Sequence, residues 1–457
     1  MKNGQRKWST SSSTALFPDR IVIMKYLVAL LLLLLASTSQ AQVNLTLEEA
    51  IKMALEHSFN LKSSRYDSAS AASEYRSARS GRFPVISLNA AAFYIDELQT
   101  VSLLPTRTIE LGSNENYQTD VRLSLPLYTG GRLSAQIDIQ KENLNFRSYG
   151  LEAERLNAAY TARRAYLGLI MSSHLVRTAD ASLQRISIIQ KDVDNLHAVG
   201  MADSVDILDA SLAYQKGKQT LVEYETTFRN SSLLLAQVTG LDAESEILPA
   251  EEIPLPDETR TISPEKTEIV RPELKQSNSR VKISKHLVGI NRAGLFPTVS
   301  GYVGYSAGKP NRDLFNAEWN DYFHAGVTLN WEFNLGGKTI HSTRSAGQAM
   351  FSSQMVREKI KEQLTLQADL ARNNLKRAFQ NFVISRTEYD IATRKYRLGQ
   401  EKHKAGEISI NRLLELEAEL TAAEQLYQVS IINYYLAESE YLYAVGDSRI
   451  FGGFTNE

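Results

Sequence analysis

Two ten-residue stretches, 206 positions apart, carry the strongest structural signal: LSLPLYTGGR at 123–132 and LNWEFNLGGK at 329–338. In each, apolar residues alternate with others up to a pair of glycines, which is typical of a β-strand that ends at a turn. A segment of about 65 residues with no proline and little glycine follows each pair, which predicts a helix of roughly 100 Å. The sequence therefore repeats one strand–turn–helix unit.

The repeat extends well beyond these stretches. RFPVISLNAAAFY at 82–94 matches LFPTVSGYVGYSA at 295–307, at a spacing of 213 residues. Past the helical segments, AVGMADSVDILDAS at 198–211 matches KAGEISINRLLELE at 404–417, where the spacing is 206 again. A glycine followed by short polar residues and an apolar helical run predicts a tight turn between two helices. The change in spacing predicts a loop insertion of seven residues in the first copy.

These matches divide the chain into two copies of one unit. We predict a first repeat at 42–240, a linker rich in proline and glutamate at 241–262, and a second repeat at 263–447. The last residues, 448–457, show no helical pattern and are predicted to form a tail.

The segment 1–41 is predicted to be an N-terminal extension and signal peptide. From Met24 it contains a lysine, a short apolar run, and small residues at Ser39 and Ala41, which is the pattern of a secretory signal and its cleavage site. The apolar run is short for a membrane span, so we expect export with Gln42 as the mature N-terminus.

The strand-like segments predict two β-hairpins, at about 83–128 and 296–335. Apolar and polar residues alternate along 323–333, and the segments have the length of a transmembrane β-strand. Aromatic residues gather near the strand ends, as in the girdles of membrane barrels. The joining segments, about 99–116 and 309–320, are predicted to be polar loops. The alternative is a soluble hairpin with one wet face.

The number of strands has a consequence for assembly. Four strands cannot close a barrel, and open edges would leave backbone groups without hydrogen bonds in lipid. If these strands enter a bilayer, several chains must therefore contribute strands to one barrel.

Two long helical hairpins complete the predicted units, at 131–240 and 337–446. After the second glycine turn, apolar residues follow three- and four-residue spacing, as in Leu413, Leu416 and Leu420. Sustained spacing of this kind indicates coiled-coil packing. The sequence alone thus predicts an α+β chain with an internal duplication.

Composition limits the classes of function and of site that the chain can have. The chain has 51 Lys+Arg against 52 Asp+Glu, so no bulk charge favours nucleic acid as a partner. It has no cysteine, which excludes disulfides, thiolate nucleophiles and cysteine-linked lipid anchors. The seven histidines are scattered, although His197 and His403 are equivalent by repeat and precede the glycine turns. A metal site there is the alternative to a simple polar role; we predict no metal, no cofactor and no enzymatic activity.

Several motifs together characterise the chain, and their order and duplication matter more than any one of them. They are LTLEEAIKMALEHSFNLK, the Phe-Pro strand starts, PLYTGGR, AVGMADSVDILDAS, RPELK, NLGGK and a terminal AVGD. In this order and duplication, the sequence resembles the TolC family of outer-membrane factors over about residues 43–447. The resemblance implies four transmembrane strands per protomer, which complete a twelve-stranded trimeric β-barrel. It also implies a periplasmic tunnel of long antiparallel coiled coils.

The same resemblance implies a function. The chain is expected to be the outer-membrane exit duct of a tripartite efflux pump, a homotrimer that works with a periplasmic membrane-fusion adaptor protein and an inner-membrane RND or ABC pump. A channel of a type I protein secretion system is one alternative. A structural periplasmic coiled-coil protein is another, but it would leave the duplicated strand hairpins unexplained.

By resemblance, the two glycine turns become adaptor-binding tips. The residues implied at the two tips are Val199, Gly200, Met201, Ala405, Gly406 and Glu407. The first tip matches the family pattern of an apolar residue on each side of glycine. The second departs from it, because Glu407 stands where the family has an apolar or small residue.

Residues just beyond the turns are implied as gate candidates. They are Asp206, Asp209, His403, Arg412 and Glu415. The latch partners of Asp206 in the family, a tyrosine and an arginine, fall here on His403 and Ile408. A family aspartate ring falls on Arg412 and Glu415. Asp206 and Arg412 occupy equivalent turn positions, so we expect them to pair across neighbouring hairpins.

Overall fold

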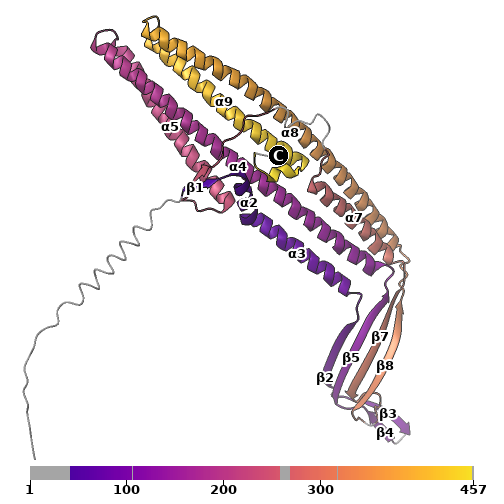
Figure 1. Cartoon of the computed structure of the whole chain (residues 1–457). Helices are drawn as coiled ribbons and strands as arrows, with labels where there is room; N and C mark the ends of the chain where they lie inside the picture. The colour runs from indigo at the N-terminus through magenta and orange to yellow at the C-terminus, as the bar shows by residue number, and fades with distance from the viewer. Residues whose placement is uncertain (1–41, 105–106, 258–267, 316, 455–457) are drawn as a thin grey trace, which may run out of the picture.

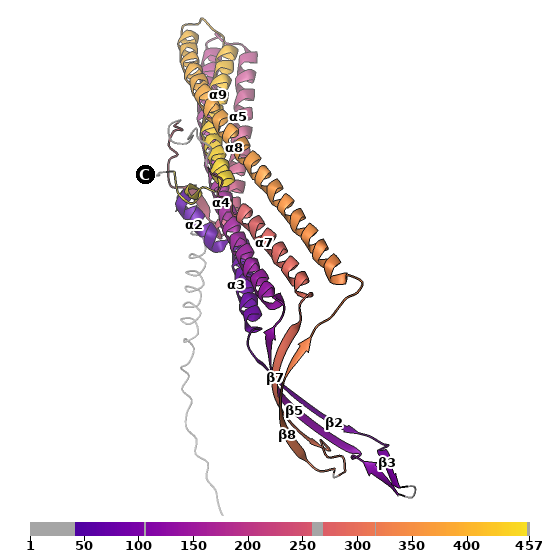
Figure 2. The same cartoon turned by 90° about the vertical axis from the view of Figure 1, so that its right-hand side faces the viewer.

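The molecule is long and narrow, with a small β-sheet at one end and two helical tips at the other (Figure 1). The computed structural model describes residues 42–104, 107–257, 268–315 and 317–454. The predicted signal segment, 1–41, and the last five residues of the predicted linker lie outside the described residues. Figure 2 shows the same arrangement from the side, with the sheet continuing beyond the helices.

Two helices of equal length form the frame. Helix α4 (Arg132–Ala198) and helix α8 (Lys338–Lys404) have 67 residues each, so each is about 100 Å long. Both begin directly after a glycine in the left-handed conformation, Gly131 with φ 87° and Gly337 with φ 69°. These glycines turn the chain from the strand into the helix, a conformation that a side chain disfavours.

Shorter helices pair with the frame in the same way in both copies. Helix α5 (Ser204–Thr239) returns along α4 and α9 (Ile410–Val445) returns along α8, and each has 36 residues. Toward the sheet, α3 (Phe59–Ser80) packs on α4 and α7 (Pro272–Ala293) packs on α8, and each has 22 residues. The predicted internal duplication is confirmed.

The packing order gives the protomer two open flanks. In the tip half, each helix contacts the next in the order α5, α4, α9, α8. In the sheet half, the order of contacts is α3, α4, α7, α8. Helix α8 therefore forms one flank throughout, whereas α3 and α5 form the other (Figure 1). Among the helices that the structure describes, none combines the length and apolarity needed to span a membrane.

The four-stranded sheet is antiparallel, in the order β2–β5–β7–β8. Its strands are β2 (Val85–Tyr94), β5 (Glu115–Tyr128), β7 (Thr298–Lys309) and β8 (Asn320–Asn330). Each copy supplies one β-hairpin, whose two strands are neighbours in the sheet. The pairing of β5 with β7 joins the two copies. The sheet thus places β2 and β8 at its edges, on the same two flanks as α3 and α8.

The register separates an apolar face from a polar face. Residues opposite one another in an antiparallel pair share a face. One face carries exposed apolar side chains from all four strands, namely Ile86, Leu88, Val121, Leu123, Val303, Phe323 and Val327. The other carries Ser87, Asn89, Asp120, Arg122, Ser306 and His324. Exposed apolar residues on every strand of one face match the predicted lipid-facing surface.

Two details of the predicted hairpins were wrong. The loop expected at 99–116 contains a further small hairpin, β3 (Gln99–Leu104) with β4 (Arg107–Leu111), whose strands of six and five residues are too short to show a clear alternation. The last strand ends at Asn330, although the alternation continues to Phe333. Instead of pairing in the sheet, Trp331 donates its indole N–H to the Leu295 carbonyl at 3.3 Å.

Two further corrections concern the region midway along the helices. The predicted linker contains β6 (Glu246–Pro249), which pairs in parallel with β1 (Gln42–Leu45) beside helix α2 (Leu47–His57). The predicted tail contains a 3₁₀ helix, η1 (Ser448–Phe451). Both segments are too short to show a periodic pattern, and tertiary contacts hold them in place.

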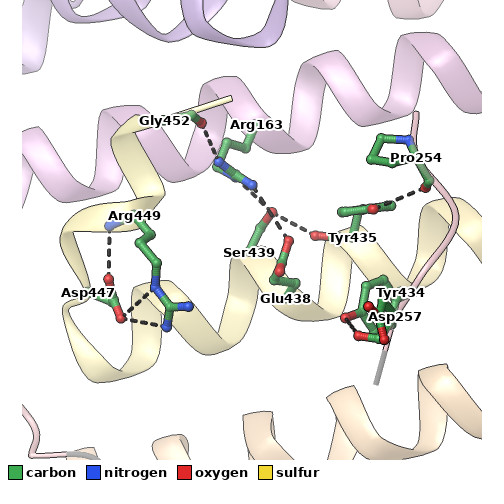
Figure 3. A network of polar contacts seen from close by, with 10 residues as sticks. All are labelled: Arg163, Pro254, Asp257, Tyr434, Tyr435, Glu438, Ser439, Asp447, Arg449 and Gly452. Carbon is green, nitrogen blue, oxygen red and sulfur yellow. Dashed lines mark hydrogen bonds and ion pairs between the residues drawn. The ribbon is translucent and has the colours of Figure 1, made fainter. Parts of the chain in front are cut away.

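Figure 3 shows what holds the C-terminal segment. Arg163 of α4 is 2% exposed; its Nε donates to Ser439 Oγ at 3.0 Å and its Nη1 donates to the Gly452 carbonyl at 2.7 Å. On the same stretch of α9, the Tyr435 hydroxyl donates to the Pro254 carbonyl at 3.0 Å. The segment between the repeats and the C-terminal segment are thereby fastened to α4 and α9.

Candidate functional site: the helical tips and the seam between the hairpins

The first tip is a glycine-closed turn. Helix α4 ends at Ala198, and Gly200 adopts φ 80°. The Gly200 N–H donates to the His197 carbonyl at 2.9 Å, and the Met201 N–H donates to the Leu196 carbonyl at 2.8 Å. These bonds satisfy carbonyls that the helix end leaves free, and they need a left-handed residue. Val199 and Met201 are 69% and 76% exposed and project from the turn.

The second tip repeats the backbone and changes the side chain. Gly406 adopts φ 77°, and its N–H donates to the His403 carbonyl at 2.9 Å. The Glu407 N–H donates to the Lys402 carbonyl, also at 2.9 Å. The Glu407 carboxylate lies 3.7 Å from the Lys402 ammonium. An exposed ion pair therefore occupies the place that Met201 has at the first tip.

The equivalent histidines close these turns. Nδ1 of His197 lies 2.9 Å from the Ala202 carbonyl oxygen, and Nδ1 of His403 lies 3.1 Å from that of Ile408. A carbonyl only accepts, so Nδ1 carries the proton and donates in both. Each ring thus spans the turn to the residue five positions on. Within the described residues, no group of three or more histidine, aspartate or glutamate side chains is placed to hold a metal ion.

Asp206, Arg412 and Glu415 make contacts within their own turns and helices. Asp203 and Asp206 form a capping box at the start of α5, in which Asp206 accepts from the Asp203 N–H at 3.2 Å. Arg412 pairs with Glu415 on α9, and its Nη1 lies 4.0 Å from a Glu419 oxygen. The pairing of Asp206 with Arg412 across neighbouring hairpins, the role of Asp209 and the ring containing Glu415 stay predictions.

An apolar cluster joins the two hairpins near the tips. It draws one or more residues from each of the four helices α4, α5, α8 and α9: Ile189, Val193, Ala210, Tyr396, Ile410, Leu413, Leu416 and Leu420. A second, larger cluster lies midway along the molecule and includes Tyr166, Phe382 and Ile432. The hydrophobic core is therefore divided into a tip part and a middle part.

A buried polar network crosses from α4 to α9 at this division. Glu417 is 2% exposed, and one of its carboxylate oxygens accepts from Ser182 Oγ at 2.8 Å, Arg185 Nε at 3.1 Å and Thr421 Oγ1 at 2.7 Å. Nη2 of Arg185 donates to Thr421 Oγ1 at 2.9 Å and lies 3.5 Å from Glu424 Oε2. We call these five residues the seam network.

The seam network cannot be predicted from the sequence pattern of either helix. Glu417 lies in LLELEAEL, next to the seam residue Leu416, and a glutamate at such a position reads as a solvent-exposed charge. Burial raises the pKa of the Glu424 carboxyl, whereas the nearby Arg185 acts in the opposite direction. The partner of Glu417 lies 232 positions away in the sequence, so only the tertiary structure shows that it is paired.

Comparison with known proteins identifies relatives along most of the chain. The family model described as outer membrane efflux protein matches residues 50–241 and 264–430. Outer membrane protein TolC of Salmonella enteritidis is 23% identical over 221 residues, which cover 47% of this chain and 44% of TolC. Outer membrane protein OprJ of Pseudomonas aeruginosa is 25% identical over 313 residues, covering 64% of this chain and 59% of OprJ. The chain spans about half the length of the curated relatives it matches.

Solved structures share the fold at low sequence identity. CusC, described as forming a transmembrane channel, has a TM-score of 0.77 and 14% identity, and the match covers 88% of this chain and 92% of CusC. The outer membrane protein VceC of Vibrio cholerae has a TM-score of 0.75 and 17% identity, covering 90% and 97%. The outer-membrane channel OprN has a TM-score of 0.75 and 16% identity, covering 91% and 96%. These matches establish the fold over nearly the whole described chain.

Proposed function

The chain belongs to the outer membrane efflux protein family, and from this membership we propose that it is the outer-membrane exit duct of a tripartite efflux pump. The predicted family and the predicted location are both confirmed: the protein resides in the outer membrane and extends into the periplasm. The duct conducts passively what a periplasmic adaptor and an inner-membrane pump deliver, and it performs no chemistry.

One observation carries this proposal: the amphipathic sheet has two unpaired edges on opposite flanks. In lipid, the N–H and C=O groups along β2 and β8 need partners, which a closed barrel supplies. If β8 of one protomer pairs with β2 of the next, three copies give the twelve strands expected from the family. The apolar face, where Ile86 is 72% exposed and Val327 is 68% exposed, then faces lipid.

The helical flanks support the same ring. On α8, Ile384, Ile391 and Leu398 are more than half exposed and recur every seven residues. On the other flank, α5 exposes Leu208 and Val222. Leu398 precedes Gly406 by eight residues and Leu208 follows Gly200 by eight, so both lie at one height above the tips. Two exposed apolar stripes at matching heights are what a coiled-coil contact between neighbouring protomers requires.

The tips provide the surface for the adaptor. Val199 and Met201 are large apolar side chains that the first turn exposes, and Gly200 keeps the backbone between them open. The second tip adds Ala405, Gly406 and Glu407, with a charged pair in place of an apolar side chain. An exposed apolar turn on a rigid helical hairpin is a typical anchor for a protein partner.

A cross-linking experiment tests the ring. Because the chain has no cysteine, a variant with L208C and L398C contains a single thiol pair. Oxidation of outer membranes should link protomers into dimers and trimers on a denaturing gel. The pair V222C with L398C is the matched control: its positions lie 14 residues apart in height, about 21 Å, and should not link. Monomers alone in the first variant would contradict the proposed trimer.

A conductance experiment tests the duct. The purified trimer, added to a planar lipid bilayer, should insert and give discrete current steps. A structural coiled-coil protein would give none. Restoration of drug resistance in a strain that lacks its own duct would favour efflux, whereas restored export of a protein substrate alone would favour type I secretion.

A further inference from the structure

The polar face of the four-stranded sheet carries few charges, and they lie together. The structure describes these strands in full, and the charged side chains and histidines on this face are Asp120, Arg122 and His324. The other charged residues of the four strands belong to the apolar face by register, namely Glu115, Lys309 and Asp321. We propose that Asp120, Arg122 and His324 form an ion-selectivity belt inside the barrel, which favours anions when the medium outside the cell is acid. This inference rests on the proposed function, because a closed barrel turns its polar face to the lumen.

A glycine lets His324 reach across a strand. Strand β7 lies between β5 and β8, and adjacent strands are about 4.8 Å apart. His324 of β8 is paired with Gly304 of β7, and a Cβ built on Gly304 would lie 2.4 Å from His324 Nε2. The imidazole therefore occupies the space above Gly304, and its Nε2 comes within 3.8 Å of Asp120 Oδ2 on β5. A side chain at position 304 would block this approach.

Arg122 is held beside the same carboxylate. Its Nε lies 3.5 Å from Asp120 Oδ1, and its guanidinium lies 5.2 Å from the centroid of the Tyr302 ring. The hydroxyl of Ser306 donates to Asp120 Oδ2 at 2.6 Å. A second glycine makes room for the tyrosine, because a Cβ built on Gly326 would lie 2.7 Å from Tyr302 Oη. One carboxylate thus has a fixed cation at one oxygen and a histidine near the other.

The imidazole of His324 can still take a proton. Within the described residues its Nδ1 has no hydrogen-bond partner, and its Nε2 is beyond hydrogen-bond distance of Asp120. The side chain is 23% exposed on the polar face, so water in the lumen reaches it. Histidine is the side chain whose charge ordinarily changes between about pH 5 and 8. The pH of the outer medium can therefore set the charge of this ring.

The surroundings of the ring contain one acidic group. Besides Asp120 and Arg122 of β5, the rings of Tyr302 and Tyr322 face His324, at centroid distances of 5.9 and 5.5 Å. Arg312, in the loop before β8, lies 4.7 Å from the centroid of the Tyr322 ring. On the far side, the proposed barrel places β2 of the next protomer, whose sequence VISLNAAAFY has no charged residue. Asp120 is thus the only carboxylate that faces the ring among the described strands.

Protonation changes the net charge of the belt. While His324 is neutral, the charges of Asp120 and Arg122 cancel. The imidazolium adds one positive charge to each protomer, and the trimer repeats it around the barrel. Rings of charged side chains set the ion selectivity of channels, and positive rings favour anions. In acid medium the belt should therefore attract small anions such as chloride, and the carboxylate groups of cargo.

The test measures the ratio of chloride to potassium permeability of the full-length trimer in planar bilayers. Trimer added to one chamber keeps its polar tunnel there, so the barrel opens into the opposite chamber, whose pH is varied. Salt at about 0.1 M keeps the screening length near 10 Å. Acidifying the opposite chamber from about pH 8 to 5 should raise the ratio severalfold in the wild type. H324Q should abolish this rise.

Two variants fix the charge of the belt. H324K and D120N each make the belt more positive by one charge, so both should show the high ratio already at about pH 8. The ratio of D120N should rise further in acid, because its histidine still titrates, and that of H324K should not. H286Q is the matched control and should respond like the wild type, because His286 also lies 3.8 Å from an aspartate, Asp138, but outside the sheet. An unheated gel shows that each variant remains a trimer.

The outcomes separate the belt from the duct. If H324Q keeps the acid response, a different group titrates and the belt is wrong, while the duct stands. A wild type that conducts with the same ratio at both pH values, or an H324K variant with the low ratio, would equally contradict the belt. If the wild-type trimer never conducts, the proposed duct itself fails and the belt fails with it.

Discussion

The two hairpins have the same backbone and different surfaces. Helices of 67 and 36 residues meet at a left-handed glycine in both, and a histidine closes each turn. The first tip exposes Val199 and Met201, whereas the second carries the Lys402–Glu407 ion pair. The two copies therefore share what the turn geometry requires and differ in the side chains that project from the turn.

The inner surfaces of the hairpins differ as well. In the second hairpin, aromatic rings stack between α8 and α9, with Tyr389 and Tyr427 at a centroid distance of 5.4 Å. In the first, α5 buries the small Ala210 and exposes Val205, Leu208 and Leu212. The return helix of the second hairpin therefore packs its aromatic rings against α8, whereas the return helix of the first, α5, exposes an apolar face.

The largest effect on assembly is expected from a charged residue placed on that apolar face of α5. L208E places a carboxylate in the proposed contact with α8 of the next protomer, where an unpaired buried charge costs about 2–5 kcal/mol. Because three such contacts form one ring, we expect loss of the trimer on a gel run without heating. L212E should act in the same direction, and D209E, a neighbouring change that keeps the charge, is the control. A stable L208E trimer would show that the first hairpin does not need a neighbour.

The next largest effect is expected from exchanging the tip side chains. M201E gives the first tip the residue of the second, and it should reduce efflux about tenfold, the effect of losing about 1.4 kcal/mol of adaptor binding. E407M, the reverse exchange, should leave efflux within about twofold. The efflux of each variant is measured as the lowest drug concentration that stops growth, in cells that contain equal amounts of trimer. Equal losses in the two variants would contradict an asymmetric pair of tips.

A smaller effect tests the shared backbone. G200A and G406A each place a Cβ on a left-handed residue, which costs roughly 1–2 kcal/mol. Neither glycine has a neighbouring heavy atom within 4 Å of a built Cβ, so strain alone should act and both variants should lose the same stability. Thermal unfolding of the two variants, followed by circular dichroism, measures this. A clear difference between them would mean that the turns are not equivalent.

The smallest effect concerns a position where the first copy has a titratable side chain and the second does not. Burial and then the nearby Arg177 lower the pKa of His174 from 6.5 to about 4. The folded state thus holds His174 neutral, so its contribution to stability is complete above pH 6.5 and is lost as the pH falls toward 4. Gln380 is the equivalent residue in the second copy. H174Q should weaken the pH dependence of urea unfolding between pH 6.5 and 4, and an unchanged dependence would exclude His174 as its source.

Sequence reasoning was strongest where a residue pattern has a single structural solution. The double glycines at 130–131 and 336–337 indicated the change from strand to helix, because few other residues turn the backbone there. It was weakest for short segments: β6, the β3–β4 hairpin and η1 have too few residues to display a period. For the candidate site, it predicted the exposed turns but not the pairing of Arg185 with Glu417.

The duplication can be predicted from the sequence, because it is a match between two stretches of that sequence. The long helices, the glycine turns and the two-residue alternation of the strands can be predicted as well, because each depends on residues close together in the chain. The tertiary structure alone decided which helices are neighbours, which sheet edges stay open and which charge meets which. Those outcomes depend on how faces far apart in the sequence pack together. Arg185 and Glu417 illustrate this division: each looks like a surface charge in its own helix, and only the packing of α4 against α9 makes them a buried pair.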